Sequence, residues 1–147
     1  MHPVTPIEKI LIAINLTDAS RRAFYVGLEQ AAKYDAETFV LHVSEPIRSY
    51  DFGKKRYVET KETIERVQEG VTARLDELWE QGGIAAVDRR KVQIIVRGGK
   101  AGPEIVETAR VRGVDLIVMG IGAGAASEHV LRHAPCSVLA VRERAGS

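Results

Sequence analysis

The 147 residues of this chain are enough for one ordinary domain with a closed hydrophobic core. Hydrophobic residues make up 45% and charged residues 28%, and a formal net charge of +1 excludes the strongly basic balance of nucleic-acid and membrane-surface proteins. The single cysteine excludes an internal disulfide, and no apolar run approaches the ~20 residues of a membrane span. The N-terminus lacks the basic and apolar regions of a secretory signal. We therefore expect a cytoplasmic single-domain protein with no nucleic acid or membrane as partner.

Five short runs rich in branched apolar residues predict the strands of a buried parallel sheet. They lie at residues 10–14, 38–43, 92–96, 116–119 and 137–142. Helix-period segments separate these runs, and the alternation is typical of a doubly wound α/β sheet. The fourth run ends in a Gly-x-Gly-x-Gly segment at 120–124, which indicates a strand that opens into a phosphate-sized turn.

Four helices are expected between the strands. The first begins at Thr17 or Asp18, because either side chain can cap the first backbone amides. The second is the longest and ends at the glycines of residues 82–83. Its apolar residues recur every three or four positions, at Ile64, Val67, Val71, Leu75 and Leu78.

The last two helices have clear start and stop signals. The third opens at Gly102 and Pro103 and is closed by Gly113, and the fourth runs from about Ala125 to about His133, before Pro135. Residues 45–57 contain a proline and a glycine and show no periodicity, so they are expected to form a loop that carries the basic run 54–56.

Over nearly its whole length the chain resembles the universal stress proteins. Six blocks carry the resemblance, in the order of the family: 9–15 (KILIAIN), 18–23 (DASRRA), 40–43 (VLHV), 102–109 (GPEIVETA), 113–120 (GVDLIVMG) and 130–138 (VLRHAPCSV). The resemblance implies one universal stress protein domain over residues 1–147, with its core at about 7–143.

The resemblance also implies a Rossmann-like fold close to that of the adenine-nucleotide alpha hydrolases. Its open five-stranded parallel sheet has the order 3-2-1-4-5, with helices on both faces. Dimerisation through the last strand, residues 137–142, is implied as well. One branch of the family binds ATP or a related nucleotide through a glycine signature, the other binds none, and neither is chiefly known as a set of enzymes.

A nucleotide or anion cleft is expected at the carboxyl ends of the first and fourth strands. If the winding of the sheet reverses between these two strands, the crevice of a doubly wound sheet lies at their carboxyl ends. The candidate residues of this cleft are Asn15, Val43, Met119, Gly120, Gly122 and Gly124.

This cleft departs from the nucleotide-binding pattern in two ways. The family signature places a long loop before a closing Gly-Ser or Gly-Thr pair, which here aligns with Gly124 and Ala125, so almost nothing remains after Gly120. Asn15 stands where nucleotide-binding relatives usually carry aspartate, and Leu16 adds apolar bulk beside it. The exposed amides of a glycine turn before a helix can still attract a phosphate. We expect weakened or lost nucleotide binding, and an ATP- or AMP-binding stress sensor is the alternative.

Several other residue groups have the spacing of sites, but a structural role fits each better. His129 and His133 have metal-pair spacing without an evident third ligand, and Cys136 beside His133 stands where a small apolar residue is wanted. Glu104 and Glu107 complement the dipole of the third helix.

Two further patterns are weaker still. The stripe of Trp79 with Val71 and Leu75 is either a partner surface or, more commonly, core. The glycines at 120–124 have the wrong spacing and the wrong strand for a dinucleotide fingerprint. The sequence therefore predicts no metal site and no catalytic residues. It indicates a homodimeric regulatory module that acts through an unknown protein partner.

Overall fold

In the computed structural model the described residues are 6–15, 20–44, 49–58, 61–82, 87–121 and 125–142. Their main feature is a five-stranded sheet in the order β5-β2-β1-β6-β7, in which every neighbouring pair is parallel. The strands are β1 (Lys9–Ile14), β2 (Glu37–Ser44), β5 (Val92–Gly98), β6 (Leu116–Ile121) and β7 (Ser137–Arg142). Counted along the chain, these five strands have the order 3-2-1-4-5. The predicted fold class and strand order are confirmed.

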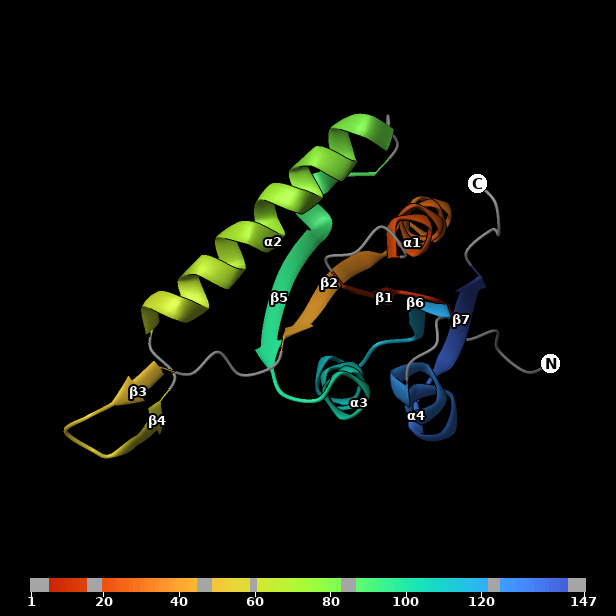
Figure 1. Cartoon of the computed structure of the whole chain (residues 1–147). Coiled ribbons are helices and arrows are strands. Elements are labelled where there is room, and N and C mark those ends of the chain that lie inside the picture. The colour runs from red at the N-terminus through yellow and green to blue at the C-terminus, as the bar shows by residue number, and fades with distance from the viewer. Residues whose placement is uncertain are drawn as a thin grey trace.

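Helices cover both faces of this sheet (Figure 1). They are α1 (Arg21–Tyr34), α2 (Lys61–Gly82), α3 (Ala101–Arg112) and α4 (Ala125–His133), with a short 3-10 helix η2 (Arg89–Lys91) before β5. Buried residues of α1 and α2 share one core layer, and buried residues of α3 and α4 share the other. No helix of the described ranges is both long and apolar enough to cross a membrane.

The first strand shows why the apolar runs are unbroken. Side chains alternate across a strand, so Ile10, Ile12 and Ile14 belong to the α1–α2 layer, while Leu11 and Ala13 belong to the α3–α4 layer. A central strand with helices on both faces needs apolar residues at every position.

Small residues set how closely the helices approach. A Cβ atom at Gly27 of α1 would lie 2.6 Å from the side chain of Ile12, so only glycine fits there. At Gly102 of α3 a Cβ would lie 2.9 Å from Cβ of His129 on α4. These two glycines fix the packing of α1 on the sheet and of α3 on α4.

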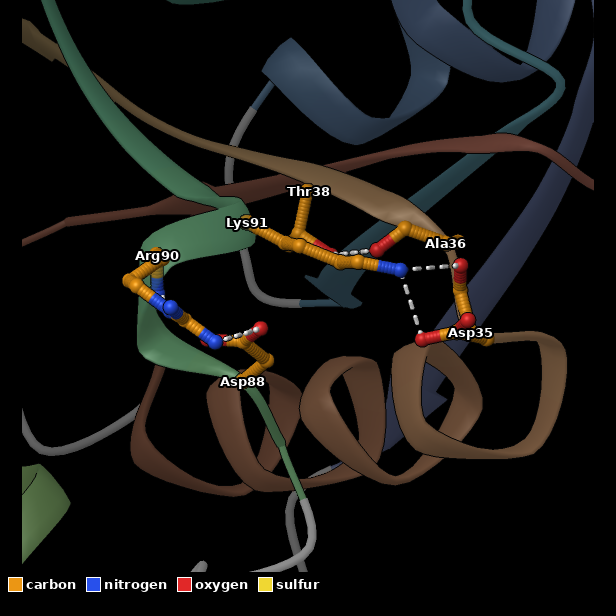
Figure 2. A network of polar contacts seen from close by, with 6 residues as sticks. All are labelled: Asp35, Ala36, Thr38, Asp88, Arg90 and Lys91. Carbon is orange, nitrogen blue, oxygen red and sulfur yellow. Dashed lines mark hydrogen bonds and ion pairs between the residues drawn. The ribbon is translucent and has the colours of Figure 1, made fainter.

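The amino edge of the sheet is held by polar contacts to the backbone. Oδ2 of Asp115 accepts hydrogen bonds from the backbone N–H groups of Glu8 (2.9 Å) and Lys9 (3.0 Å). Further along the same edge, Nζ of Lys91 donates to Oδ1 of Asp35 at 2.7 Å, as Figure 2 shows. The first contact joins the turn before β6 to the start of β1, and the second joins the turn before β5 to the turn before β2.

The helix boundaries follow most of the sequence signals. The start and end of α4 are confirmed, and Gly113 caps α3 with a left-handed φ of +66°. Helix α1 begins after Ser20; the expected caps Thr17 and Asp18 lie outside the described residues. Ile64 does not continue the buried stripe of α2, because it is 48% exposed.

The expectation of a loop at 45–57 is wrong for its described part. Residues 49–58 fold into an antiparallel hairpin of β3 (Ser49–Asp51) and β4 (Arg56–Val58), while residues 45–48 lie outside the described ranges. The hairpin forms because Oδ1 of Asp51 accepts from the N–H groups of Gly53 (2.9 Å) and Lys54 (3.0 Å), and Lys55 adopts a φ of +52°. The basic run 54–56 is exposed, as expected.

Candidate functional site

The carboxyl ends of β2, β1 and β6 meet at one edge of the sheet. Ile14 of β1 is in register with His42 of β2, and Ala13 is in register with Met119 of β6. The strand β1 has β2 on one side and β6 on the other, so the winding of the sheet reverses beside it. In doubly wound sheets the ligand crevice lies at this position.

Four of the six predicted cleft residues lie at this carboxyl edge. Asn15 directly follows β1 and is exposed, and Val43 near the end of β2 is half-buried. On β6, Met119 is buried and Gly120 is half-buried. The other two predicted residues, Gly122 and Gly124, lie outside the described residues.

Ser20 is a residue of this edge that the sequence analysis missed. Its hydroxyl donates a hydrogen bond to the backbone oxygen of Asn15 at 2.6 Å, and the side chain is buried. The bond ties the end of β1 to the start of α1. A capping signal would not have found this contact, because the Ser20 side chain bonds back to Asn15 and makes no cap hydrogen bond to α1.

His42 is a second missed residue. It is buried at the carboxyl end of β2, and its Nδ1 lies 3.4 Å from the carbonyl oxygen of Ile14. Because a carbonyl oxygen only accepts, this bond requires the proton on Nδ1. Sequence patterns do not single out such a residue, because one polar side chain within an apolar run does not change the prediction of a buried strand.

Arg142 brings a positive charge to the same edge. It is the exposed last residue of β7 and is in register with Ile121, the last residue of β6. The backbone of Arg142 therefore lies beside the point where the chain leaves β6. The sequence analysis treated this residue only as the end of an apolar strand.

The connection from β6 to α4 is short. The strand ends at Ile121 and the helix begins at Ala125, so residues 122–124 are the whole connection. We call these three residues the β6–α4 connection. A connection of this length supplies few backbone amides for enclosing a ligand, although the helix that follows it carries the partial positive charge of its N-terminus.

The histidine and acidic pairs do not form a metal or catalytic cluster within the described residues. The rings of His129 and His133 are 4.5 Å apart, and within the described part of the chain no three metal-binding side chains come together. The carboxylate of Glu107 accepts from Arg110, and this hydrogen bond lowers the pKa of Glu107.

Cys136 has the environment of a packing residue. It contacts the α3–α4 core layer, and burial raises the pKa of its thiol above the ordinary value of 9.0, with a smaller contribution from the charge of Asp115. The thiol is therefore protonated at neutral pH, which does not suit a nucleophile.

The stripe on α2 is core, as expected. Val71 and Leu75 are buried in the α1–α2 layer, and Trp79 is partly buried against them. The guanidinium of Arg89 covers the Trp79 ring at 5.4 Å from its centroid. A cation over the ring is a common arrangement for an aromatic residue at the margin of a core.

The doubly wound parallel sheet and its switch point define a Rossmann-like fold, and comparison with known proteins identifies its family. Residues 6–142 match the Universal stress protein family. The chain is 32% identical over 146 residues to universal stress protein A homolog 2 of Coxiella burnetii, which covers 92% of this chain and 94% of that protein. The chain belongs to the universal stress protein family.

Solved structures share the fold at lower identity. Universal stress protein UspA from Lactobacillus plantarum superposes with a TM-score of 0.69 at 20% identity, over 95% of this chain and all of that one. A universal stress protein solved in complex with cAMP gives a TM-score of 0.68 at 18% identity, over 93% and 98% of the two chains.

Proposed function

We propose that this protein is a cytoplasmic, homodimeric regulatory module of the stress response whose nucleotide binding is weakened, and that it acts through contact with a protein partner rather than by catalysis. The observation that carries the proposal is the three-residue β6–α4 connection. The resemblance implies that nucleotide-binding relatives have a long loop at this position, which encloses the phosphates.

The loss of such a loop has a large effect on affinity. A hydrogen bond to a charged group contributes about 1.5–3 kcal/mol, so the loss of two amide–phosphate bonds removes about 3–6 kcal/mol. That difference weakens binding by about 10²–10⁴-fold. Asn15 adds to the effect, because a neutral amide is a weaker acceptor for ribose hydroxyls or a metal than a carboxylate.

The open edge of β7 supports the homodimer. It is the last strand of the sheet, and its residues Val138, Leu139 and Ala140 are only half-buried. An edge strand with free backbone groups and partly exposed apolar side chains is suited to pairing with another chain. Light scattering is expected to give the mass of at least a dimer, and a monomer at high concentration contradicts this part of the proposal.

Titration calorimetry with ATP and with AMP, in the presence of Mg²⁺, tests the binding proposal. We expect dissociation constants well above ~1 μM, which corresponds to about −8 kcal/mol. Tighter binding would overturn it. A chain in which residues 122–124 are replaced by the longer family loop, with Asn15→Asp and Ala125→Ser, is the positive control and should gain affinity.

The second candidate is an adenine-nucleotide sensor. The structural neighbour in complex with cAMP favours it, because that protein places a nucleotide on the same fold. A thermal shift produced by ATP or AMP but not by inorganic phosphate would support the sensor over the weakened module. Mass spectrometry of small molecules released from the purified protein is an independent test.

A further inference from the structure

One part of the molecule stands away from the sheet. It consists of the β3–β4 hairpin, residues 49–58, and the first half of α2, residues 64–70, and we call it the arm. In Figure 1 the hairpin projects at one end of the molecule, beside the N-terminal end of α2. In this half of α2, six of the seven residues are exposed and Val67 is half-buried. The arm thus leaves both a hairpin and a helix uncovered.

The hairpin has an exposed aromatic face. Tyr50 and Tyr57 lie opposite each other across the two strands with ring centroids 5.2 Å apart, and Tyr50 also meets Phe52 at 4.9 Å. Phe52 is 84% exposed and Tyr57 is 64% exposed. A two-stranded hairpin is marginally stable by itself, so covering this face would stabilise it.

The two elements of the arm carry opposite charge. Residues 49–58 contain three basic residues and one acidic residue, and the acidic one, Asp51, is engaged by the amides of its own turn. Residues 61–82 contain six acidic and three basic residues. The formal charges are therefore +2 for the hairpin and −3 for α2.

Three of the six acidic residues of α2 border an open groove, and one of them, Asp76, forms an ion pair with Arg89. The groove has a volume of about 410 Å³ and is bordered by Glu65, Gln68, Glu69, Thr72, Ala73 and Asp76. These residues form one stripe at helical spacing, so the groove runs along α2 away from the hairpin. Lysine side chains are complementary to the acidic residues of this groove in charge, and their apolar stems and aromatic rings can cover its apolar atoms.

We propose that the arm binds a second copy of this chain, with the hairpin of each protomer seated on the acidic groove of its partner's α2. A twofold axis makes the exchange reciprocal, because each chain carries both complementary surfaces. In this arrangement the partner's α2 covers the aromatic face of the hairpin, and the basic residues 54–56 lie against the acidic groove. The exchange is separate from the β7 edge and does not rest on the proposed function.

The charge distribution favours a second copy over an anionic surface. A phosphate-rich membrane or nucleic acid attracted to Lys54 and Lys55 would also approach the acidic helix beside them and be repelled by it. Only a partner with a cationic and an anionic surface uses both parts of the arm.

Charge reversal in the full chain tests the proposal by sedimentation velocity at low salt. In a dimer of either variant, K54E/K55E or E65K/E69K, the hairpin and the groove that face each other carry charge of the same sign at both contacts. Each variant should lower the weight-average mass about twofold relative to wild type, whatever mass the β7 edge contributes. The control R22E/K33E changes exposed residues of α1 by the same charge as K54E/K55E and should keep the wild-type mass. Circular dichroism checks that each variant is folded.

A mixture of the two reversal variants is the decisive measurement. The acidic hairpin of one then faces the basic groove of the other, and the unchanged surfaces face each other in the second half, so the wild-type mass should return. Unchanged mass in both folded reversal variants, or no recovery on mixing, overturns the proposal.

Vesicles of equal parts phosphatidylserine and phosphatidylcholine, and a single-stranded oligonucleotide, distinguish the other partners. An anionic partner is indicated if the protein binds either of these, K54E/K55E abolishes the binding and E65K/E69K strengthens it. If both variants also keep the wild-type mass, this result overturns the proposal.

Discussion

The two edges of the central sheet use their polar residues in opposite ways. At the amino edge, Asp115 accepts from two backbone N–H groups and Lys91 reaches the carboxylate of Asp35. At the carboxyl edge, Asn15 and Arg142 are exposed at strand ends. The polar groups of the amino edge serve the fold. At the carboxyl edge the buried Ser20 and His42 also bond to the backbone, whereas the exposed Asn15 and Arg142 lie where the proposed ligand would meet them. Under the proposed function, the amino edge contributes to stability alone, and the exposed groups of the carboxyl edge contribute to binding.

Asp115→Ala should give the largest effect and the sharpest contrast between the edges. Its carboxylate holds the N–H groups of Glu8 and Lys9, and charged hydrogen bonds contribute about 1.5–3 kcal/mol each before solvent screening. We expect the free energy of unfolding to fall by about 2–3 kcal/mol in urea titrations, with no change in phosphate response. A variant of wild-type stability would show that the amino edge is not the anchor.

Ser20→Ala should have an intermediate effect and act on both properties. The buried hydroxyl donates to the backbone oxygen of Asn15, so its removal should cost about 1 kcal/mol of unfolding free energy. It should also weaken any response to phosphate, because Asn15 loses its tie to α1. Ser20→Thr, which keeps the hydroxyl, is the matched control. Equal phosphate responses in wild type and Ser20→Ala would place Asn15 outside the site.

Cys136, at the amino edge before β7, should make stability fall in alkaline solution. Burial raises its pKa in the folded state, so the unfolded chain loses the thiol proton first as the pH rises. The folded state is thus favoured below the ordinary thiol pKa of 9.0, and this advantage is lost as the pH rises through the folded pKa. Urea midpoints across this range should decline less in Cys136→Ala. Parallel declines in the two proteins would contradict the assignment.

The response to phosphate should be the smallest effect. If the β6–α4 connection still offers amides to an anion, phosphate should raise the melting temperature slightly, less so at high salt, and ATP should add little. Gly122→Val should remove this gain beyond its own destabilisation, because a β-branched residue cannot use the backbone conformations that are open to glycine. Arg142→Ala should reduce the gain with little loss of stability. A clear shift with ATP alone, abolished by Gly122→Val, would favour the nucleotide sensor.

Sequence reasoning succeeded where a signal extended over a whole element. The five strands are continuous branched runs, and Pro135 stops the helix that ends at His133. It failed at the hairpin because strands of three residues are too short to show alternation. The apolar period of α2 includes Ile64, which is 48% exposed, because periodicity does not show how much of the helix is covered by the rest of the molecule.

The site was predictable only in part. The switch point follows from strand order, so Asn15 and Gly120 could be placed at one edge from the sequence. His42 was hidden inside an apolar run, and Arg142 depends on the register of β7 with β6, which no local pattern contains. Register is a tertiary property, so residues that it brings together are found only in the folded chain.

The short β6–α4 connection has a consequence for engineering. The entropy of closing a loop grows only slowly with its length, so a fourfold extension of these three residues costs about 1.2 kcal/mol. Stability therefore does not require the connection to be short. Because Asp115 anchors β6 at the opposite, amino edge, the connection is a place where a longer loop can be inserted with little effect on the sheet. Under the proposed function, a single insertion at this connection would restore ligand binding while the core stays the same.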